Sequence, residues 1–286
     1  MGLTIRELLS IGEHKLLDAG VESCGIDAET LLGFELGLDK AGLFLNRSCV
    51  IDDERSESWF ALIGRRAAGE PLQYITGEQY FMGLRFCVDP SVLIPRPETE
   101  LLASKAIEFL LAEDNGKSVL DLCTGSGALA VSIAKACPRA SVTASDISAD
   151  ALACAKQNAR ALGVADRVNF VKSDLFAAFE RGACGGPFDL IVTNPPYIRT
   201  GDFTALPSEI REHEPVTALD GGIDGLDFYR RIASGARGCM QPGACLMLEI
   251  GADQTEAVTT IFSGAGFASI ETFRDLNGLD RMIKTS

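Results

Sequence analysis

Short runs of apolar and β-branched residues alternate with helix-like segments along the last two thirds of the chain. This alternation favours a mostly parallel β-sheet with helices on both faces, because parallel neighbours need a crossover between them. Sheets of this kind bind their ligands beyond the carboxyl ends of the strands. We expect strands at 118–122, 141–145, 168–172, 190–193, 245–250, 269–274 and 281–285, and helices near 98–112, 126–136, 149–162, 225–239 and 253–264.

Residues 1 to about 70 are predicted to be helical. Trp59 and Ile63 lie four positions apart, as residues on one face of a helix do, and Gly69 follows where a helix end is expected. Asp27 is a candidate cap for the helix that contains the apolar residues Leu31 and Leu32. No ionisable cluster stands out, so we interpret these stripes as the core of a small helical domain that docks a partner.

Between about 69 and 100 the pattern changes to aromatic and β-branched residues that are interrupted by Gly and Pro. Two such runs flank Met82-Gly83, which is typical of a β-hairpin, and three prolines then favour an extended path. We therefore predict a helical docking domain at 1–72, a hairpin and extended linker at 73–95, and a catalytic α/β domain at 96–286.

A glycine-rich loop follows the first strand of the predicted sheet. Gly125-x-Gly127-x-x-Ala130 stands between that strand and a helix, and Asp146 follows 19 positions after Gly127. This spacing matches the dinucleotide fingerprint, in which backbone approaches a ligand at a helix N-terminus and an acid accepts hydrogen bonds from ribose hydroxyls. On this loop alone, a dinucleotide-dependent dehydrogenase or a non-catalytic nucleotide sensor remains an alternative.

The acidic residues near the loop favour a cationic ligand. Asp121 lies four positions before Gly125, where a carboxylate is awkward beside a pyrophosphate but suits the ammonium of S-adenosylmethionine. Asp174 follows the third strand, where it would lie beside an adenine. Each acid also has a local alternative, because Asp121 can cap its own loop, Asp146 can form an Asx turn and Asp174 can be a helix N-cap.

The fourth strand ends in Asn194-Pro195-Pro196-Tyr197. Two prolines cannot donate to a sheet, so the strand must stop, and they hold the Asn194 side-chain oxygen and the Pro195 carbonyl in fixed directions. Such a pair of acceptors suits a planar NH₂ group, against which Tyr197 can pack its ring. A turn that merely ends a strand is the alternative.

These four residues are candidate catalytic residues for methyl transfer to an amide or aromatic amino nitrogen. The lone pair of such a nitrogen is delocalised, which makes it a poor nucleophile. Two fixed acceptors favour a more pyramidal nitrogen and stabilise the charge that develops on it, and the turn holds it in line with the methyl group. The attack does not need a general base, which fits a chain with two histidines.

At these residues the sequence resembles the class I S-adenosylmethionine-dependent amino methyltransferases, which act on adenine or cytosine amino groups or on glutamine amides. Four further segments narrow the resemblance to the glutamine methyltransferases of peptide chain release factors (the HemK/PrmC type), and together they cover nearly the whole chain. These segments are LIPRPETELL (93–102), EHEPVTALDGGIDGLDFYRRI (212–232), LEIG (248–251) and DLNGLDRM (275–282).

The resemblance implies a Rossmann-like α/β methyltransferase domain with a mostly parallel seven-stranded sheet, preceded by a small all-helical domain and a hairpin linker. It implies methyl transfer from S-adenosylmethionine to the glutamine side chain of the Gly-Gly-Gln tripeptide of release factors, which leaves S-adenosylhomocysteine. The glutamine would be bound by Asn194, Pro195, Pro196 and Tyr197. The cofactor would be bound by Asp121, Cys123, Thr124, Gly125, Ser126, Gly127, Asp146, Asp174, Leu175 and Asn194.

One position departs from the family pattern, and three others match it without an assigned role. The family usually has Gly where this chain has Cys123. Arg96, Glu98 and Glu249 match the family, but no chemical step follows for them from the sequence.

Composition limits the partners. The formal net charge of −14 disfavours direct nucleic-acid binding, which usually needs a basic surface. Methylation of nucleic-acid adenine or cytosine, or of a ribosomal protein glutamine, is the alternative function. Nine irregularly spaced cysteines and two histidines argue against a disulfide framework and a metal site. With no long apolar span or signal-peptide pattern, we expect a cytoplasmic location without a membrane partner. We also predict a monomer.

Overall fold

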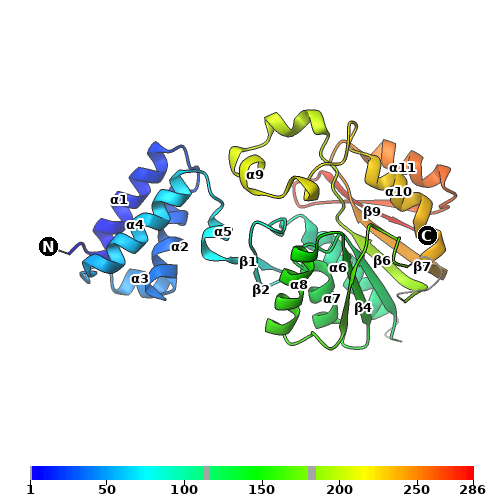
Figure 1. Cartoon of the computed structure of the whole chain (residues 1–286), viewed down its shortest axis with the longest axis horizontal. Coiled ribbons are helices and arrows are strands. Elements are labelled where there is room, and N and C mark those ends of the chain that lie inside the picture. Colours follow the sequence, from blue (N-terminus) through cyan, green and yellow to red (C-terminus); the bar gives the residue numbers. More distant parts are fainter. Residues whose placement is uncertain (1, 113–115, 180–184) are drawn as a thin grey trace. The chain divides into compact units, whose positions relative to one another are not determined.

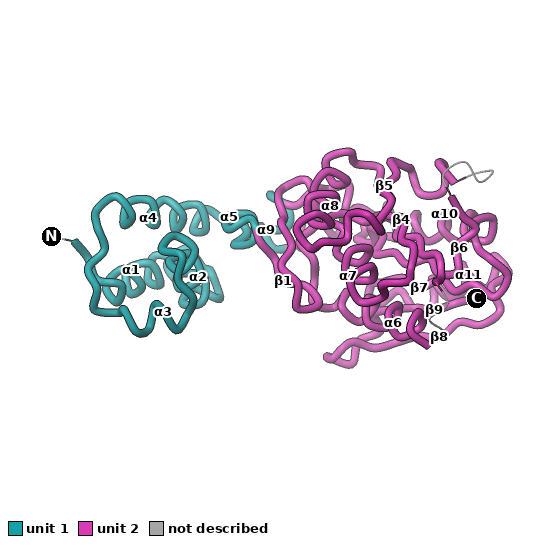
Figure 2. The backbone as a smooth tube through the Cα atoms, turned by 90° about the horizontal axis from the view of Figure 1, so that it is seen from below, with its two compact units in different colours: residues 1–77, 207–213 teal, residues 78–206, 214–286 magenta. Residues whose placement is uncertain are grey.

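The structure, a computed structural model, describes residues 2–112, 116–179 and 185–286. The chain divides into two compact units, which Figure 2 colours separately. The first consists of Met1–Gly77 with Pro207–His213, and the second of Glu78–Leu206 with Glu214–Ser286. A short segment from the second half of the chain thus packs with the N-terminal helices.

The first unit, here called the helical unit, has the core that its sequence predicts. Trp59 and Ile63 are fully buried, and Gly69 has a φ of 93° just beyond the last helical turn before it, as expected of a helix end. The helices of this unit are α1 (Ile5–Asp18), α2 (Cys24–Leu36), α3 (Lys40–Leu45), α4 (Asp53–Ala67), α5 (Leu72–Thr76) and α9 (Ser208–His213).

The prediction that Asp27 caps a helix is wrong. Helix α2 begins at Cys24, so Asp27 lies inside its first turn and is buried. Its carboxylate accepts a hydrogen bond of 2.7 Å from Nε of Arg66, and Nη1 of Arg66 lies 2.8 Å from the Glu209 carboxylate of α9. This ion pair joins residues that are far apart in sequence, so helical periodicity does not reveal it.

The second unit, here called the catalytic unit, contains the seven predicted strands. Their order in the sheet is β5-β4-β3-β6-β7-β9-β8, and only β9 runs antiparallel to its neighbours. Figure 1 labels β4, β6, β7 and β9 of this sheet. The strands are β3 (Ser118–Leu122), β4 (Ser141–Asp146), β5 (Val168–Lys172), β6 (Phe188–Thr193), β7 (Met240–Glu249), β8 (Ile270–Arg274) and β9 (Asp280–Thr285). The mostly parallel α/β sheet is confirmed.

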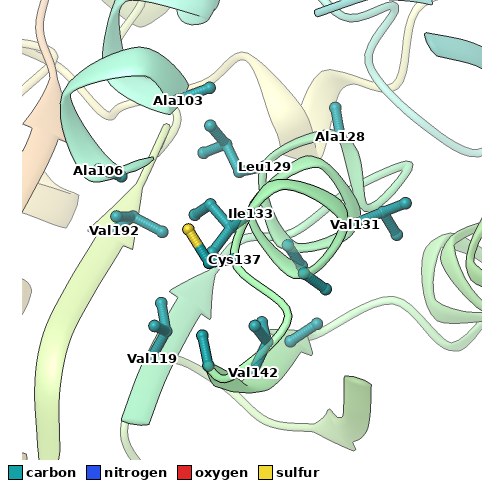
Figure 3. Packing of buried hydrophobic residues seen from close by; sticks show 14 of the residues in the cluster. Ala103, Ala106, Val119, Ala128, Leu129, Val131, Ile133, Cys137, Val142 and Val192 are labelled. Atoms are coloured by element: carbon teal, nitrogen blue, oxygen red, sulfur yellow. The ribbon is translucent and has the colours of Figure 1, made fainter. Parts of the chain in front are cut away.

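Helices cover both faces of this sheet. Alternate residues of one strand enter different cores, because successive side chains of a strand point to opposite faces: Val119 packs on one side and Leu120 on the other. Figure 3 shows Leu129 and Ile133 of α7 directed towards Ala106 and Val192 in the first core. The helices of the first core are α6 (Thr99–Ala112), α7 (Ala128–Ala136) and α8 (Ala149–Ala161). The other face of the sheet is covered by α10 (Asp227–Gly235) and α11 (Thr255–Gly264).

The predicted hairpin is confirmed and packs on the first core. Strands β1 (Glu78–Phe81) and β2 (Leu84–Cys87) are antiparallel, and the side chains of Phe81 and Phe86 are buried in the cluster that α6 and α7 form. Short 3₁₀ helices complete the structure at Thr200–Ala205, Val216–Ala218 and Ala236–Cys239.

Three further observations concern the described residues only. None of their helices has the length and apolarity to cross a membrane. Their eight cysteines form no disulfide with one another, while Cys184 lies outside the described ranges. Within the same ranges, no three His, Cys, Asp or Glu side chains are grouped as metal ligands.

Candidate active site

A cavity of about 380 Å³ lies in the catalytic unit at the carboxyl ends of the strands, a volume within the range of small-molecule sites. Of the residues that the sequence suggested, seven line it: Cys123, Gly125, Asp146, Asp174, Leu175, Asn194 and Pro196. The other six do not line it: Asp121, Thr124, Ser126, Gly127, Pro195 and Tyr197. Each lies within two positions of a lining residue in the chain, and five of the six are buried.

The Asp121 side chain holds the start of the glycine loop by hydrogen bonds. Oδ2 of Asp121 accepts hydrogen bonds from the Thr124 hydroxyl at 2.6 Å and from the Ala130 amide at 3.1 Å. Oδ1 is buried and has no partner among the described residues. Burial raises the pKa of Asp121 to about 7. Asp121 thus caps its own loop, which is one of the two interpretations that the sequence allows, the other being a partner for a cationic ligand.

Cys123 begins this loop with a φ of 58°, in the left-handed region that favours glycine. The backbone therefore explains why a family with this loop would use Gly at the position. The side chain is half-buried, and burial raises the pKa of its thiol far above the usual range. This thiol stays protonated and is a poor nucleophile.

Asp146 joins two loops at the cavity. Its Oδ2 accepts a hydrogen bond of 2.9 Å from the Gly125 amide, and its Oδ1 accepts one of 2.9 Å from the Ser148 amide at the start of α8. The second bond is an Asx turn, so the local alternative is realised while the residue also lines the cavity. Burial raises the pKa of Asp146, and the two amide donors oppose that rise.

Asp174 and Leu175 form the wall that follows β5. Oδ1 of Asp174 lies 2.7 Å from the Arg231 guanidinium, which also lines the cavity. Leu175 is buried and has a φ of 47°. The N-cap alternative for Asp174 finds no support, because the described residues that follow it, 175–179, form turns rather than an α-helix.

The Asn194–Tyr197 turn is held by side chains from distant segments. Nδ2 of Asn194 donates to Oγ1 of Thr99 over 3.1 Å, and Thr99 donates to Oε2 of Glu249 over 2.6 Å. The Tyr197 hydroxyl donates to Oε1 of the same carboxylate over 3.1 Å. Burial, followed by the charge of Glu249, raises the pKa of Tyr197, so its hydroxyl keeps the proton that it donates.

A second set of contacts holds the backbone of the turn. Nε2 of Gln254 donates to the Tyr197 carbonyl over 3.0 Å, and the amide of Ile198 donates to the Leu219 carbonyl over 2.9 Å. A Cβ at Gly225 would lie 2.5 Å from the Tyr197 carbonyl oxygen, so only glycine fits this approach.

Sequence reasoning missed Thr99 and Gln254 and assigned no role to Glu249. Thr99 lies in the segment LIPRPETELL, and Glu249 in LEIG, both of which the resemblance singled out. The family resemblance indicates that these segments matter, but it does not indicate which of their side chains are in contact.

The sheet order, the glycine loop with its acid on the next strand, and the Asn-Pro-Pro-Tyr turn together define a methyltransferase. The sequence matches two family models, the PrmC N-terminal domain over residues 7–77 and the methyltransferase small domain over residues 99–210. The ribosomal protein L11 methylase of Lactobacillus delbrueckii subsp. bulgaricus has the same fold, with a TM-score of 0.51 at 22% identity over 70% of this chain and 83% of that chain.

Relatives of known name extend over nearly the full length. The release factor glutamine methyltransferase of Geobacter sulfurreducens is 44% identical over 98% of this chain and 95% of its own. That of Chlorobaculum tepidum is 40% identical over 97% and 95%, respectively. The chain belongs to the family of release factor glutamine methyltransferases.

Proposed function

We propose that this enzyme transfers the methyl group of S-adenosylmethionine to the side-chain amide nitrogen of the glutamine in the Gly-Gly-Gln tripeptide of peptide chain release factors. The observation that carries the proposal is the position of Asn194. Its carboxamide is fixed by a buried hydrogen-bond chain and lines the same cavity as Gly125 and Asp146.

The residues of the cavity fit S-adenosylmethionine. A Cβ at Gly125 would meet no atom within 4 Å, which leaves the loop open to a ligand, and Asp146 can accept hydrogen bonds from ribose hydroxyls. When bound, this cofactor supplies an electrophilic methyl group on its sulfonium. Its holders are Asp121, Cys123, Thr124, Gly125, Ser126, Gly127, Asp146, Asp174, Leu175 and Asn194, of which Asp121, Thr124, Ser126 and Gly127 act through the shape of the loop.

The Asn194–Tyr197 turn acts on the glutamine. The Asn194 side-chain oxygen and the Pro195 carbonyl accept the two hydrogens of the glutamine amide, and the two prolines keep both acceptors rigid. These acceptors stabilise the positive charge that the nitrogen gains as its bond to the methyl carbon forms and the carbon–sulfur bond breaks. The nitrogen then loses one proton to solvent, and S-adenosylhomocysteine remains.

The helical unit, residues 1–72 of the predicted division, is proposed to dock the release factor. Phe44 and Leu45 of α3 are 62% and 80% exposed, and the Arg47 guanidinium lies 4.4 Å from the centre of the Phe44 ring. Exposed apolar side chains next to a cation are typical of protein-binding surfaces. The proposal takes the enzyme as a cytoplasmic monomer that binds no nucleic acid directly.

The decisive experiment offers the enzyme tritiated methyl donor together with a release factor, an oligonucleotide, or a release factor whose tripeptide glutamine is replaced by alanine. We expect label in the first protein alone, and mass spectrometry should place one added methyl on the tripeptide glutamine. Label in the oligonucleotide alone, or equal label in both release factors, would contradict the proposal.

A further inference from the structure

Two buried residues outside the Asn194–Tyr197 turn determine which face of the Asn194 carboxamide meets the substrate. We propose that Thr99 and Glu249 form a relay that keeps the oxygen of this carboxamide, rather than its NH₂ group, directed at the glutamine amide. The inference rests on the proposed function and adds two positioning residues to it.

The relay consists of three groups from three elements. Asn194 follows β6, Thr99 begins α6 and Glu249 ends β7. Nδ2 of Asn194 lies 3.1 Å from Oγ1 of Thr99, which lies 2.6 Å from Oε2 of Glu249. Thr99 and Glu249 are 5% and 2% exposed, so water does not compete for these bonds.

The direction of each bond follows from the number of protons. A threonine hydroxyl has one proton, and a carboxylate can only accept. The distance of 2.6 Å from Thr99 to Glu249 is that of a hydroxyl that donates to a charged oxygen. The proton of Thr99 therefore points at Glu249, and its lone pairs are left for the NH₂ group of Asn194.

The pKa of Glu249 is raised above its ordinary value, chiefly by burial, and the donors Thr99 and Tyr197 and the positive charge of Arg281 limit that rise. The charged form of Glu249 in the relay is inferred from the short bond to Thr99 and from the donor at each of its two oxygens. Since Tyr197 donates to Oε1 while Thr99 donates to Oε2, one carboxylate orients both ends of the turn.

Orientation matters because a carboxamide is nearly symmetric in shape. The final torsion of Asn has a broad, roughly two-fold preference, so its own geometry does not select one face. If the group turned over, its NH₂ would face the NH₂ of the substrate, and an acceptor that stabilises the developing charge would be lost. The relay prevents this rotation of the carboxamide by offering Asn194 an acceptor on one side only.

The test compares substitutions at Thr99 with a matched control. Thr99→Val keeps the shape but removes the acceptor, and we expect kcat to fall about 10- to 100-fold while the Kd for the methyl donor changes less than about threefold. Thr99→Ser keeps the hydroxyl and should retain kcat within about threefold. Thr285→Val is the control, because that buried hydroxyl has no partner among the described residues, and its kcat should not change.

Glu249→Gln supplies an intermediate case. A glutamine can accept from Thr99 in one orientation of its amide and donates to it in the other, so kcat should fall less than in Thr99→Val. Wild-type kcat in Thr99→Val would overturn the inference. So would an equal loss in Thr99→Ser and Thr99→Val, because the hydroxyl would then not be the cause.

A readout without turnover separates this inference from the proposed function. The side-chain NH₂ signals of Asn194, assigned by their loss in Asn194→Ala, should shift in Thr99→Val and stay in place in Thr285→Val. Unshifted signals overturn the relay even if the enzyme methylates release factors. Shifted signals without any methylation of release factors keep the relay and end the proposed function.

Discussion

Two loops meet at the carboxyl edge of the sheet, and they are held in different ways. The Cys123–Gly127 loop is held by segments that follow one another closely in the chain. The bonds from Thr124 and Ala130 to Asp121 span three and nine positions. Those from Gly125 to Asp146 and from Asn158 to Ser126 span 21 and 32 positions. The bonds of the Asn194–Tyr197 turn to Thr99 and Glu249 span 95 and 52 positions. Side chains from adjoining strands and helices hold the first loop, whereas side chains from more distant segments orient the second.

This difference separates binding from chemistry. A loop that is held by the strands and helices next to it can present backbone to a cofactor in many related proteins. A turn that must stabilise charge within a fraction of an ångström needs support from several rigid elements. Changes in the first loop should therefore alter cofactor affinity and stability, and changes around the second should alter turnover.

The largest expected effect is at the turn itself. Asn194→Ala removes an acceptor that serves the transition state, so kcat should fall about 10²- to 10³-fold, or roughly 3 to 4 kcal/mol. The Kd for S-adenosylmethionine, measured by calorimetry, should rise far less than kcat falls, because Asn194 is one of several residues that hold the cofactor. Equal turnover in the wild type and in Asn194→Ala would show that this turn does not take part in the chemical step.

The second prediction concerns the buried acid of the glycine loop. The pKa of Asp121 is about 7 in the folded protein against an ordinary value of 3.8, so the folded state keeps a proton that the unfolded chain releases between these values. The free energy of unfolding should therefore decrease as pH rises from about 4 to about 7, by up to roughly 4 kcal/mol.

Asp121→Asn keeps an acceptor for Thr124 but cannot titrate, so its urea-unfolding free energy should decrease less between pH 5 and pH 8 than that of the wild type. Asp146 and Glu249 contribute a slope of the same sign to both proteins, and the difference between the two is the readout. Identical slopes would contradict the buried state of Asp121.

The third prediction tests the backbone support of the turn. Gly225→Ala would place a Cβ 2.5 Å from the Tyr197 carbonyl oxygen and 2.7 Å from Nε2 of Gln254, at a φ of 73°. We expect a loss of stability of roughly 2 to 3 kcal/mol and a fall in kcat of at least about tenfold. Gly201→Ala, which meets no atom within 4 Å, is the matched control and should match the wild type in thermal unfolding and kinetics.

The fourth prediction returns to the cofactor side. Asp146→Ala removes an acceptor for ribose hydroxyls and releases the Gly125 and Ser148 amides. The Kd for S-adenosylmethionine should rise about 10- to 30-fold, or roughly 1.5 to 2 kcal/mol, while kcat at saturating donor changes little. An unchanged Kd in calorimetry would argue against this carboxylate as a cofactor contact.

The smallest expected effect is at Cys123. Cys123→Gly relieves the left-handed backbone but makes the unfolded chain more flexible, so the net gain in unfolding free energy should be at most about 1 kcal/mol. The Kd for the methyl donor should remain the same. A clear loss of stability would show that the thiol packs well enough to outweigh its backbone strain.

Much of the fold and part of the site could be predicted from local patterns. Strand and helix periodicity located the seven strands, and the residues that follow β3, β4, β5 and β6 reached one cavity because parallel strands end at one edge. The buried pair of Asp27 and Arg66 and the bond between Thr99 and Asn194 could not be predicted, since neither partner carries a local sign of the other.

The amino-acid sequence by itself determined the alternation of strands and helices, the glycine loop and the two prolines that end β6, because each depends on the backbone preferences of a few adjacent residues. Only the tertiary structure decided that Thr99, Glu249 and Gln254 surround Asn194-Pro195-Pro196-Tyr197. The reason is physical: a hydrogen bond needs its two atoms within about 3 Å, and only the packing of helices against the sheet brings segments 50 to 100 residues apart that close.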